Sequence, residues 1–254
     1  MNNMEETKTI NNDNIIKNIS YDQSEILYNI MNLYNDGKPF ECDITASELK
    51  FYKKNIKQKF EIPIPKILMD VYPQRDDIVK ITPFKRLPLE DNSISSIVVD
   101  LPFVISPHTS PSSTDAKDGS MLIFKRFSGF YPVAEMFENY WWWMSECNRV
   151  LKDDGIIVWK SQSTVSGGIN YQTEEFSFMC ATRLGLYTID KFYLEAKARL
   201  ISNAKMKNQC HARKYTSSFY VFKKDSKFGE KNNYFKMIED YTTNSLENKV
   251  WEVK

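Results

Sequence analysis

The chain has 254 residues, a formal net charge of +1 at pH 7, 42% hydrophobic residues and 26% charged residues. This length and composition allow a sizeable core and fit one α/β domain with loop insertions or short appendages. The nearly neutral charge excludes a protein that is basic throughout, so any affinity for nucleic acid must come from a local basic patch.

Cysteine and histidine usage limits the kinds of site that the chain can form. The four cysteines are scattered, no CxxC pair occurs, and there are only two histidines, so we expect neither a metal site nor a disulfide framework. The amino-terminal segment is polar, without the apolar core of a signal peptide, and no apolar run is long enough to span a bilayer. These features predict a cytoplasmic protein with no membrane partner.

The first half of the chain passes from a polar tail to short apolar segments. Residues 1–20 are rich in Asn, Lys and Glu and predict a flexible tail. Apolar residues at helical spacing predict a helix that starts near Ser24 and ends near Gly37. The apolar segments that follow predict strands within residues 40–43, 66–73, 76–82 and 97–100.

The second half of the chain alternates helical and extended patterns. An amphipathic pattern over residues 133–154 predicts a long helix. On that helix we expect Trp141 on the core face, with Trp142 and Trp143 covering an interface or the sheet edge. Residues 161–168 predict either a wall of a substrate cleft or a flexible turn. The remaining patterns predict a strand at 155–160, a helix at 173–185, and strands at 187–196 and 215–224.

Strands that alternate with helices predict an α/β fold with a largely parallel, doubly wound sheet. The last two strands have no full helix between them, which predicts an antiparallel hairpin at one edge. This combination is the Rossmann-like layout of class I methyltransferases, and the GxGxxG turn of a dehydrogenase does not occur. We therefore expect a methyltransferase domain over residues 21–225 and a carboxyl-terminal appendage over 226–254.

The segment IVVDLPF carries the most informative chemistry. Asp100 ends an apolar strand, and the carboxyl ends of strands in open α/β sheets are where ligands bind. The exocyclic amino nitrogen of adenine or cytosine is a poor nucleophile, and Asp100 and the carbonyl of Leu101 could accept its two N–H groups. Pro102 would stiffen the turn, and Phe103 would stack on an extruded base.

This segment resembles the D-P-P-Y/F motif of amino-methyltransferases that act on DNA. The wider chain is similar to a family of adenine-specific DNA methyltransferases of phages and low-GC bacteria. The similarity extends from about Leu33 to Lys224, and its pieces include CDITASELKFYK, DVYPQRDDIVK, RLPLEDNSISSIVVDLPF, FKRFSGF and QCHARKYTSSFYVFKK. The resemblance implies a class I fold, S-adenosylmethionine as cofactor and DNA as partner.

Candidate cofactor residues follow the first strands of the expected sheet. Asp70 ends a strand, where a carboxylate can accept hydrogen bonds from ribose hydroxyls or remain a solvated strand end. The resemblance places Asp43 as the acidic residue of the loop that holds the methionine part of the cofactor, with Thr45 and Ser47 as further hydrogen-bonding groups. It also places Thr82 close to the adenine.

The chain departs from the family pattern at four positions. Ile44 replaces a proline and Leu49 replaces a glycine in the methionine loop, and without glycine a close backbone approach to the methionine carboxylate is harder. Thr82 stands near a position that tends to be acidic. Leu101 replaces the first proline of the catalytic motif, although its carbonyl is retained.

Two segments carry the residues that we expect to contact nucleic acid. FKRFSGFY interleaves Lys125 and Arg126 with aromatic residues, a composition that suits phosphates and stacked bases. Residues 197–214 contain no acidic residue; this segment is either a positive patch that binds phosphates or a solvated loop. Its candidate contacts are Arg199, Lys205, Lys207, Arg213 and Lys214.

The first hypothesis is therefore an adenine-specific DNA methyltransferase. No Pro-Cys pair of the kind used by carbon-5 cytosine enzymes occurs, so transfer would be direct, without a covalent enzyme intermediate. The four departures support an alternative, a catalytically silent methyltransferase-like protein that binds nucleic acid or supports an active partner subunit. RNA or a protein amide as substrate, and a homodimer as assembly, also stay open.

Overall fold

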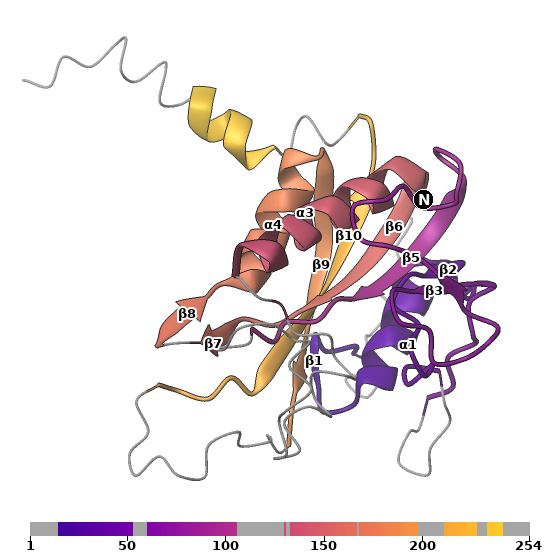
Figure 1. Cartoon of the computed structure of the whole chain (residues 1–254), viewed down its shortest axis with the longest axis horizontal. Helices are drawn as coiled ribbons and strands as arrows, with labels where there is room; N and C mark the ends of the chain where they lie inside the picture. Colours follow the sequence, from indigo (N-terminus) through magenta and orange to yellow (C-terminus); the bar gives the residue numbers. More distant parts are fainter. Residues whose placement is uncertain are drawn as a thin grey trace, which may run out of the picture.

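The computed structural model describes residues 15–52, 60–105, 130, 133–166, 168–197, 211–227 and 233–240. Its centre is an eight-stranded sheet in the order β1-β9-β10-β6-β5-β2-β3-β4, and a separate two-stranded hairpin is formed by β7 and β8 (Figure 1). None of the helices in the described part of the chain is both long and apolar enough to cross a membrane.

The strand directions follow from the pairing in the sheet. β2, β3, β4, β5 and β6 form a parallel block, whereas β10 pairs antiparallel with both β6 and β9, and β1 pairs parallel with β9. The strands are β1 Ile19–Ser20, β2 Cys42–Asp43, β3 Ile67–Asp70, β4 Val79–Lys80, β5 Ile94–Asp100, β6 Leu151–Ser161, β7 Thr164–Ser166, β8 Ile169–Tyr171, β9 Leu186–Glu195 and β10 Thr216–Lys224.

The predicted fold is confirmed by this topology. A mostly parallel sheet with helices on both faces and one reversed strand near the edge is the class I methyltransferase layout. The reversed strand is β10, which forms the expected antiparallel pair with β9 and inserts between β9 and β6. The short β1, which lies within the last two residues of the expected tail, covers the outer edge of β9.

Helices cover both faces of the sheet. α1 (Gln23–Tyr34) packs on one face, and α3 (Val133–Val150) and α4 (Thr173–Arg183) pack together on the other (Figure 1). Asp22 caps α1, because its carboxylate accepts a hydrogen bond from the Ser24 amide at 2.9 Å.

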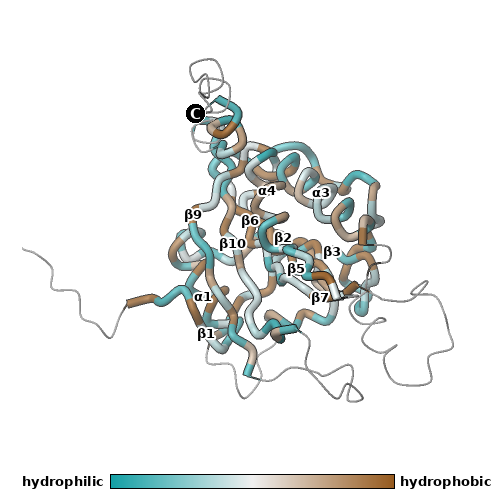
Figure 2. The backbone as a smooth tube through the Cα atoms, turned by 90° about the vertical axis from the view of Figure 1, so that its left-hand side faces the viewer, coloured by the Kyte–Doolittle hydropathy of each residue, from teal (hydrophilic) through white to brown (hydrophobic). Residues whose placement is uncertain are grey.

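Alternation along the central strands divides the buried side chains into two cores. In β5, Ile97 and Val99 join the core under α3 and α4, whereas Val98 joins the core under α1, as expected for side chains that point to opposite faces. Figure 2 shows that the central β6 is more hydrophobic than β9 near the edge of the sheet.

Two sequence expectations change in the structure. The prediction for Trp141 is wrong, because its side chain is 42% exposed, whereas Trp143 is 2% exposed and belongs to the core. Trp142 packs against Phe84, with 6.0 Å between the ring centroids. Ser161 is the last residue of β6, and Thr164–Ser166 form β7, which pairs with β8.

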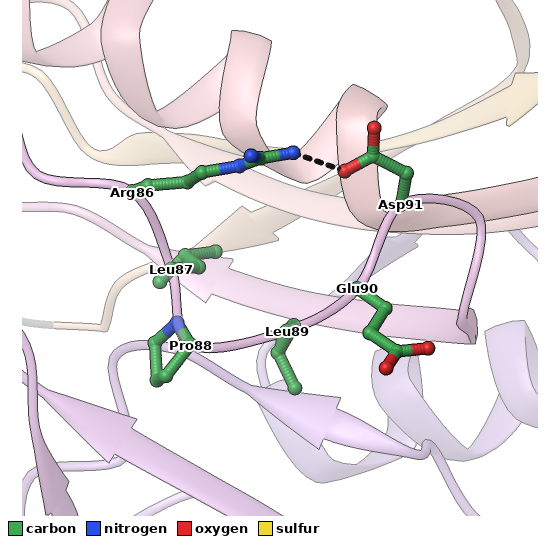
Figure 3. A pocket seen from close by; sticks show the side chains of 6 residues that line it. All are labelled: Arg86, Leu87, Pro88, Leu89, Glu90 and Asp91. Carbon is green, nitrogen blue, oxygen red and sulfur yellow. Dashed lines mark hydrogen bonds and ion pairs between the residues drawn. The ribbon is translucent and has the colours of Figure 1, made fainter.

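The opposite edge of the sheet, at the amino end of β5, is held by ion pairs. Arg149 at the end of α3 contacts Glu146 and Asp91, each at 2.7 Å. The nearby loop surrounds a shallow hollow of about 460 Å³ lined by residues 86–91, where the side chains of Arg86 and Asp91 meet (Figure 3). Because it lies at the amino end of β5, this hollow is far along the strand from Asp100 and is not the candidate site.

Candidate active site

Three acidic residues end neighbouring parallel strands at the carboxyl edge of the sheet. Asp43 ends β2, Asp70 ends β3 and Asp100 ends β5. β2 lies between β3 and β5. Along the chain, β3 and β4 are added on one side of β2, and β5 and β6 on the other, so a topological switch point lies between β2 and β5. Open α/β sheets bind ligands at this switch point. The structure therefore brings together the three carboxylates that the sequence singled out.

The Asp43 carboxylate is buried and accepts three hydrogen bonds from its own chain. Oδ1 accepts hydrogen bonds from the Thr45 amide at 2.7 Å and the Thr45 hydroxyl at 3.1 Å, and Oδ2 accepts one from the Tyr52 hydroxyl at 2.8 Å. Burial raises the pKa of Asp43 to about 7, against these hydrogen bonds, which lower it. With its residue 1% exposed, Asp43 organises the loop rather than reaching a ligand.

Thr45 links the loop after β2 to the end of β5. Its hydroxyl oxygen donates to Asp43 and accepts the Asp100 amide hydrogen at 2.8 Å. The half-buried Thr45 thus joins the loop after β2 to the end of β5, and any shift of one segment is transmitted to the other.

The Asp70 carboxylate is tied to the same loop from the other side. Its Oδ2 accepts the Ser47 amide hydrogen at 2.8 Å, and its Oδ1 accepts that of Tyr72 at 2.7 Å. Burial raises the pKa of this carboxyl, and the two amide hydrogen bonds lower it. A carboxylate has about four lone-pair sites, so Asp70 retains acceptor capacity for a ligand hydroxyl.

The loop keeps a glycine-like backbone at positions where the chain has no glycine. Ser47 has φ 45° and Leu49 has φ 59°, in the left-handed region that costs L-residues about 1 kcal/mol or more. The Leu49 side chain is 3% exposed and packs in the core under α1. The backbone path expected of the family glycine is therefore present, and the substituted side chain points into the core.

Asp100 forms an ion pair with Lys160 across the β5–β6 ladder. The Lys160 ammonium lies 2.9 Å from Oδ2, and the two side chains are 13% and 26% exposed for Lys160 and Asp100 respectively. The same ammonium lies over the rings of Phe51 and Phe219, at 5.2 and 5.6 Å from their centroids. Within the described part of the chain, Oδ1 of Asp100 has no hydrogen-bond partner.

The turn after Asp100 is anchored by a helix. The Tyr140 hydroxyl of α3 donates to the Pro102 carbonyl at 3.2 Å. Tyr140 is fully buried, and this burial raises the pKa of its phenol far above the usual value, which keeps the hydroxyl protonated as a donor. Leu101 is buried, whereas Pro102 and Phe103 are half-buried at the edge of the site.

Thr82 lies just beyond the end of β4, in a turn that its own carbonyl closes by accepting the Lys85 amide hydrogen at 3.2 Å. Its neighbour Ile81 donates to the carbonyl of Asp70 at 2.9 Å. Thr82 is exposed beside the end of β3, on the side of the sheet where the resemblance places the adenine.

A second, polar hollow of about 250 Å³ lies beyond the end of β6, on the same edge as Asp100. This hollow is formed by residues around the β7–β8 hairpin, at the start of α4 and at the beginning of β10. Its lining residues are Ser163, Asn170, Gln172, Glu174, Glu175, Lys214 and Thr216. Of residues 161–168, Ser163 lines this hollow.

Most of the expected nucleic-acid contacts fall outside the described residues. These are Lys125, Arg126, Arg199, Lys205 and Lys207. Arg213 is exposed and Lys214 is half-buried, and both precede β10 at the carboxyl edge of the neighbouring β6. The two described members of the basic segment therefore lie on the side of the molecule that carries Asp100.

Four residues of the site were not identified from the sequence. They are Phe51, Tyr52, Tyr140 and Lys160. Lys160 and Tyr140 contact the end of β5 and the turn after it, which lie far away along the chain. The Phe51 ring lies against the Lys160 ammonium, and Tyr52 donates to Asp43. A charged residue at the end of a buried strand, as in GIIVWK, was the available signal for Lys160. The other three match ordinary core patterns.

No protein-family model and no curated protein matches the sequence. The chain is similar to solved structures at a low level. One is provisionally assigned as a sarcosine dimethylglycine methyltransferase from Galdieria sulphuraria, with TM-score 0.43, 15% identity, and coverage of 80% of this chain and 85% of that chain. Another is provisionally assigned as a methyltransferase from Thermoplasma acidophilum, with TM-score 0.31, 10% identity, and coverage of 82% and 66%.

At these scores neither likeness bears on substrate or site residues. The fold assignment rests instead on the strand order, on the single reversed strand β10 and on the helices that cover both faces. By that topology, the chain has the Rossmann-like fold of a class I methyltransferase.

Proposed function

We propose that the protein is an S-adenosylmethionine-dependent methyltransferase that acts on the exocyclic amino group of adenine in DNA. The observation that carries this proposal is the state of Asp100 at the switch point of the sheet. Lys160 engages one carboxylate oxygen, and the other has no partner within the described part of the chain. A partly exposed acceptor followed by Leu101, Pro102 and Phe103 suits a planar amino group.

The residues around β2 and β3 fit the cofactor in part. Asp70 retains lone pairs for the ribose hydroxyls, and Ser47 and Leu49 have the left-handed backbone that glycine would readily adopt. Asp43 fits as a support for this loop, because it is 1% exposed and its oxygens accept three hydrogen bonds from the loop itself. When bound, the cofactor would supply an electrophilic methyl group on a sulfonium.

The chain itself would prepare the amino nitrogen for attack. Oδ1 of Asp100 would accept one N–H group and the Leu101 carbonyl the other, which draws the lone pair out of the ring and stabilises the charge that develops on nitrogen. Asp100 is then the acceptor for the proton that this nitrogen loses after transfer. Phe103 would stack on the base, and the Tyr140 hydrogen bond to Pro102 would hold the turn in place.

A nucleic-acid substrate is supported by charge. Residues 197–214 between β9 and β10 carry several basic residues and no acidic one, and Arg213 at the end of this segment is exposed on the Asp100 side. Such a patch supplies the phosphate contacts that a nearly neutral protein otherwise lacks. Adenine in DNA, rather than RNA, is the choice that the sequence resemblance favours.

A second candidate is a methyltransferase-like protein without turnover. It is favoured by the hydrogen bonds that the chain itself makes to the candidate cofactor residues. Amides and hydroxyls of the chain already donate to both oxygens of Asp43 and to those of Asp70. Such a protein would bind nucleic acid or support an active partner subunit.

One experiment separates these candidates. Titration calorimetry of the full chain with S-adenosylmethionine and S-adenosylhomocysteine is combined with transfer of a labelled methyl group to adenine-containing duplex DNA. We expect micromolar binding, roughly −8 kcal/mol, and a loss of about 100-fold or more in transfer rate for Asp100→Ala. Asp91→Ala is the matched control, because it also removes a paired carboxylate, but at the opposite edge of the sheet.

The contrary outcomes are distinct. No heat with either ligand, alone or with DNA, would favour the silent protein. Transfer to single-stranded RNA but not to DNA would keep the enzyme and change its substrate. Full activity of Asp100→Ala would remove the catalytic assignment.

A further inference from the structure

We infer that Lys160 is a positioning residue for Asp100, which holds one carboxylate oxygen so that the other is presented to the amino group of the substrate. This inference rests on the proposed function. It assigns to β6 a part in a site that the sequence motif places entirely on β5 and the turn after it.

The register of the sheet places Asp100 and Lys160 directly beside each other. Asp100 and Lys160 are direct partners in the parallel β5–β6 ladder, so their side chains leave the sheet on the same face and at the same edge. The ammonium lies 2.9 Å from Oδ2, and both side chains are largely removed from water. An ion pair in this environment is screened less by salt than a surface pair.

Two aromatic rings restrict where the ammonium can move. Phe51 follows the loop after β2, and Phe219 belongs to β10, which pairs with β6. Their ring centroids lie 5.2 and 5.6 Å from the Lys160 ammonium. Both rings belong to the buried core under α1. Cation–π attraction to these fixed rings keeps the four-carbon side chain in one arrangement, although lysine is otherwise flexible.

The two carboxylate oxygens of Asp100 therefore have different roles. Oδ2 is engaged by Lys160, and the backbone amide of Asp100 is fixed by the Thr45 hydroxyl at 2.8 Å. Rotation of the carboxylate would break the contact with Lys160, so Oδ1 is held as the acceptor for the substrate. Placing the positive charge on the Oδ2 side also keeps it away from the amino nitrogen, which becomes positively charged during transfer.

The arrangement also connects Asp100 to the cofactor side of the site. Phe51 is followed directly by Tyr52, whose hydroxyl donates to Asp43. Lys160 is therefore in contact with segments on both sides of the switch point: the end of β5 and the end of the loop after β2.

The test compares three variants of the full chain with the wild type in methyl transfer to adenine-containing duplex DNA. Lys160→Met removes the charge but keeps the length and the apolar contact with the two rings, whereas Lys160→Arg keeps the charge. Lys191→Met is the matched control. Lys191 also lies over two rings, Tyr193 and Tyr220, and 3.9 Å from Glu174, but on β9, which β10 and β6 separate from β5.

We expect Lys160→Met to lower kcat by about 10- to 100-fold, with the KM for S-adenosylmethionine changed less than about twofold. Lys160→Arg should recover a large part of the loss, and Lys191→Met should match the wild type. A denaturation series with Lys160→Met, Asp100→Asn and the double variant gives a readout that does not need turnover. The double variant should shift the midpoint by less than the sum of the single shifts.

The outcomes divide clearly. An active wild type with Lys160→Met as fast as Lys191→Met would overturn the role of Lys160 and leave the proposed function intact. An increase in kcat would overturn it as well, since Lys160 would then oppose the reaction. Additive midpoint shifts would show that the pair is not coupled and would also overturn the inference. A wild type without methyl transfer would remove the proposed function, and the catalytic role of Lys160 with it.

Discussion

The carboxylates that end β2 and β5 belong to adjacent strands but are in different states. Asp43 is buried and accepts three hydrogen bonds from Thr45 and Tyr52, whereas Asp100 is partly exposed and has one oxygen without a described partner. A buried carboxylate that accepts three hydrogen bonds from its own chain stabilises a loop, and a partly exposed one with a free oxygen can take part in chemistry. The same residue type therefore serves structure on one strand and, as we propose, the reaction on the next.

Thr45 is the physical link between these two states. Its hydroxyl donates to Asp43 and accepts from the backbone of Asp100, so the buried side of the site supports the geometry of the exposed side. Changes in the β2 loop should mainly affect stability, and changes around the β5 turn should mainly affect turnover.

The largest effect is expected from the pH dependence of stability at Asp43. Burial raises its pKa in the folded protein to about 7 from 3.8, so the folded state keeps a proton that the unfolded chain loses between these values. The stabilising contribution is complete below about pH 4 and is lost as the pH rises through about 7. The unfolding free energy of the wild type, relative to Asp43→Asn, should fall by up to about 4 kcal/mol over this window.

Chemical denaturation at intervals from pH 4 to pH 8 measures this difference. Subtracting the Asp43→Asn curve removes the contributions of other titrating groups, such as Glu146, whose pKa is lowered mainly by Arg149 despite the opposing effect of burial. A difference that does not change with pH would mean that Asp43 is ionised when folded, and the contrast between the two strand ends would be weaker.

At Leu49, substitution by glycine should be less destabilising than substitution by alanine, the reverse of the order expected within a helix. Replacing a buried leucine by alanine costs about 3 kcal/mol, and at φ 59° alanine keeps the left-handed strain that glycine avoids. Leu49→Gly should therefore be about 1 kcal/mol more stable than Leu49→Ala. At Leu27, a buried position within α1, glycine should instead be about 1 kcal/mol less stable than alanine.

Thermal or denaturant unfolding of these four variants tests the loop conformation directly. If the alanine variant is more stable than the glycine variant at both positions, Leu49 does not have a left-handed backbone. The backbone of the loop after β2 would then no longer support the proposal that this loop binds the cofactor.

The smallest stability effect is expected for Tyr140→Phe, on the β5 side. Loss of the hydrogen bond to the Pro102 carbonyl should cost about 1 kcal/mol of unfolding free energy. The turn would then be less firmly held, and kcat should fall on the order of tenfold while cofactor affinity stays unchanged. Steady-state kinetics and calorimetry measure the two quantities.

Tyr34→Phe is the comparison variant. It removes a similar hydroxyl contact, to Asp190 between α1 and β9, and should lower stability without changing kcat. Equal kcat for both variants would show that the β5 turn does not depend on Tyr140.

Much of the fold could be predicted because it depends on local patterns. Apolar runs and helical periodicity located most of the sheet strands and the helices α1, α3 and α4, and the lack of a helix between the last two strands predicted their antiparallel pairing. The error at Trp141 arose where three tryptophans are consecutive: 100° per residue places Trp143, not Trp141, beside Tyr140 and Met144 on the buried face.

The sequence by itself determined the order of strands and helices and the position of acidic residues at three strand ends. These features follow from the periodicity of apolar residues and from turn residues, which act within a few positions along the chain. Only the tertiary structure decided which carboxylate is buried and which is available. That distinction depends on Tyr52, which donates to Asp43, and on Thr45 and Lys160, which strand register and packing bring to Asp100 from distant segments.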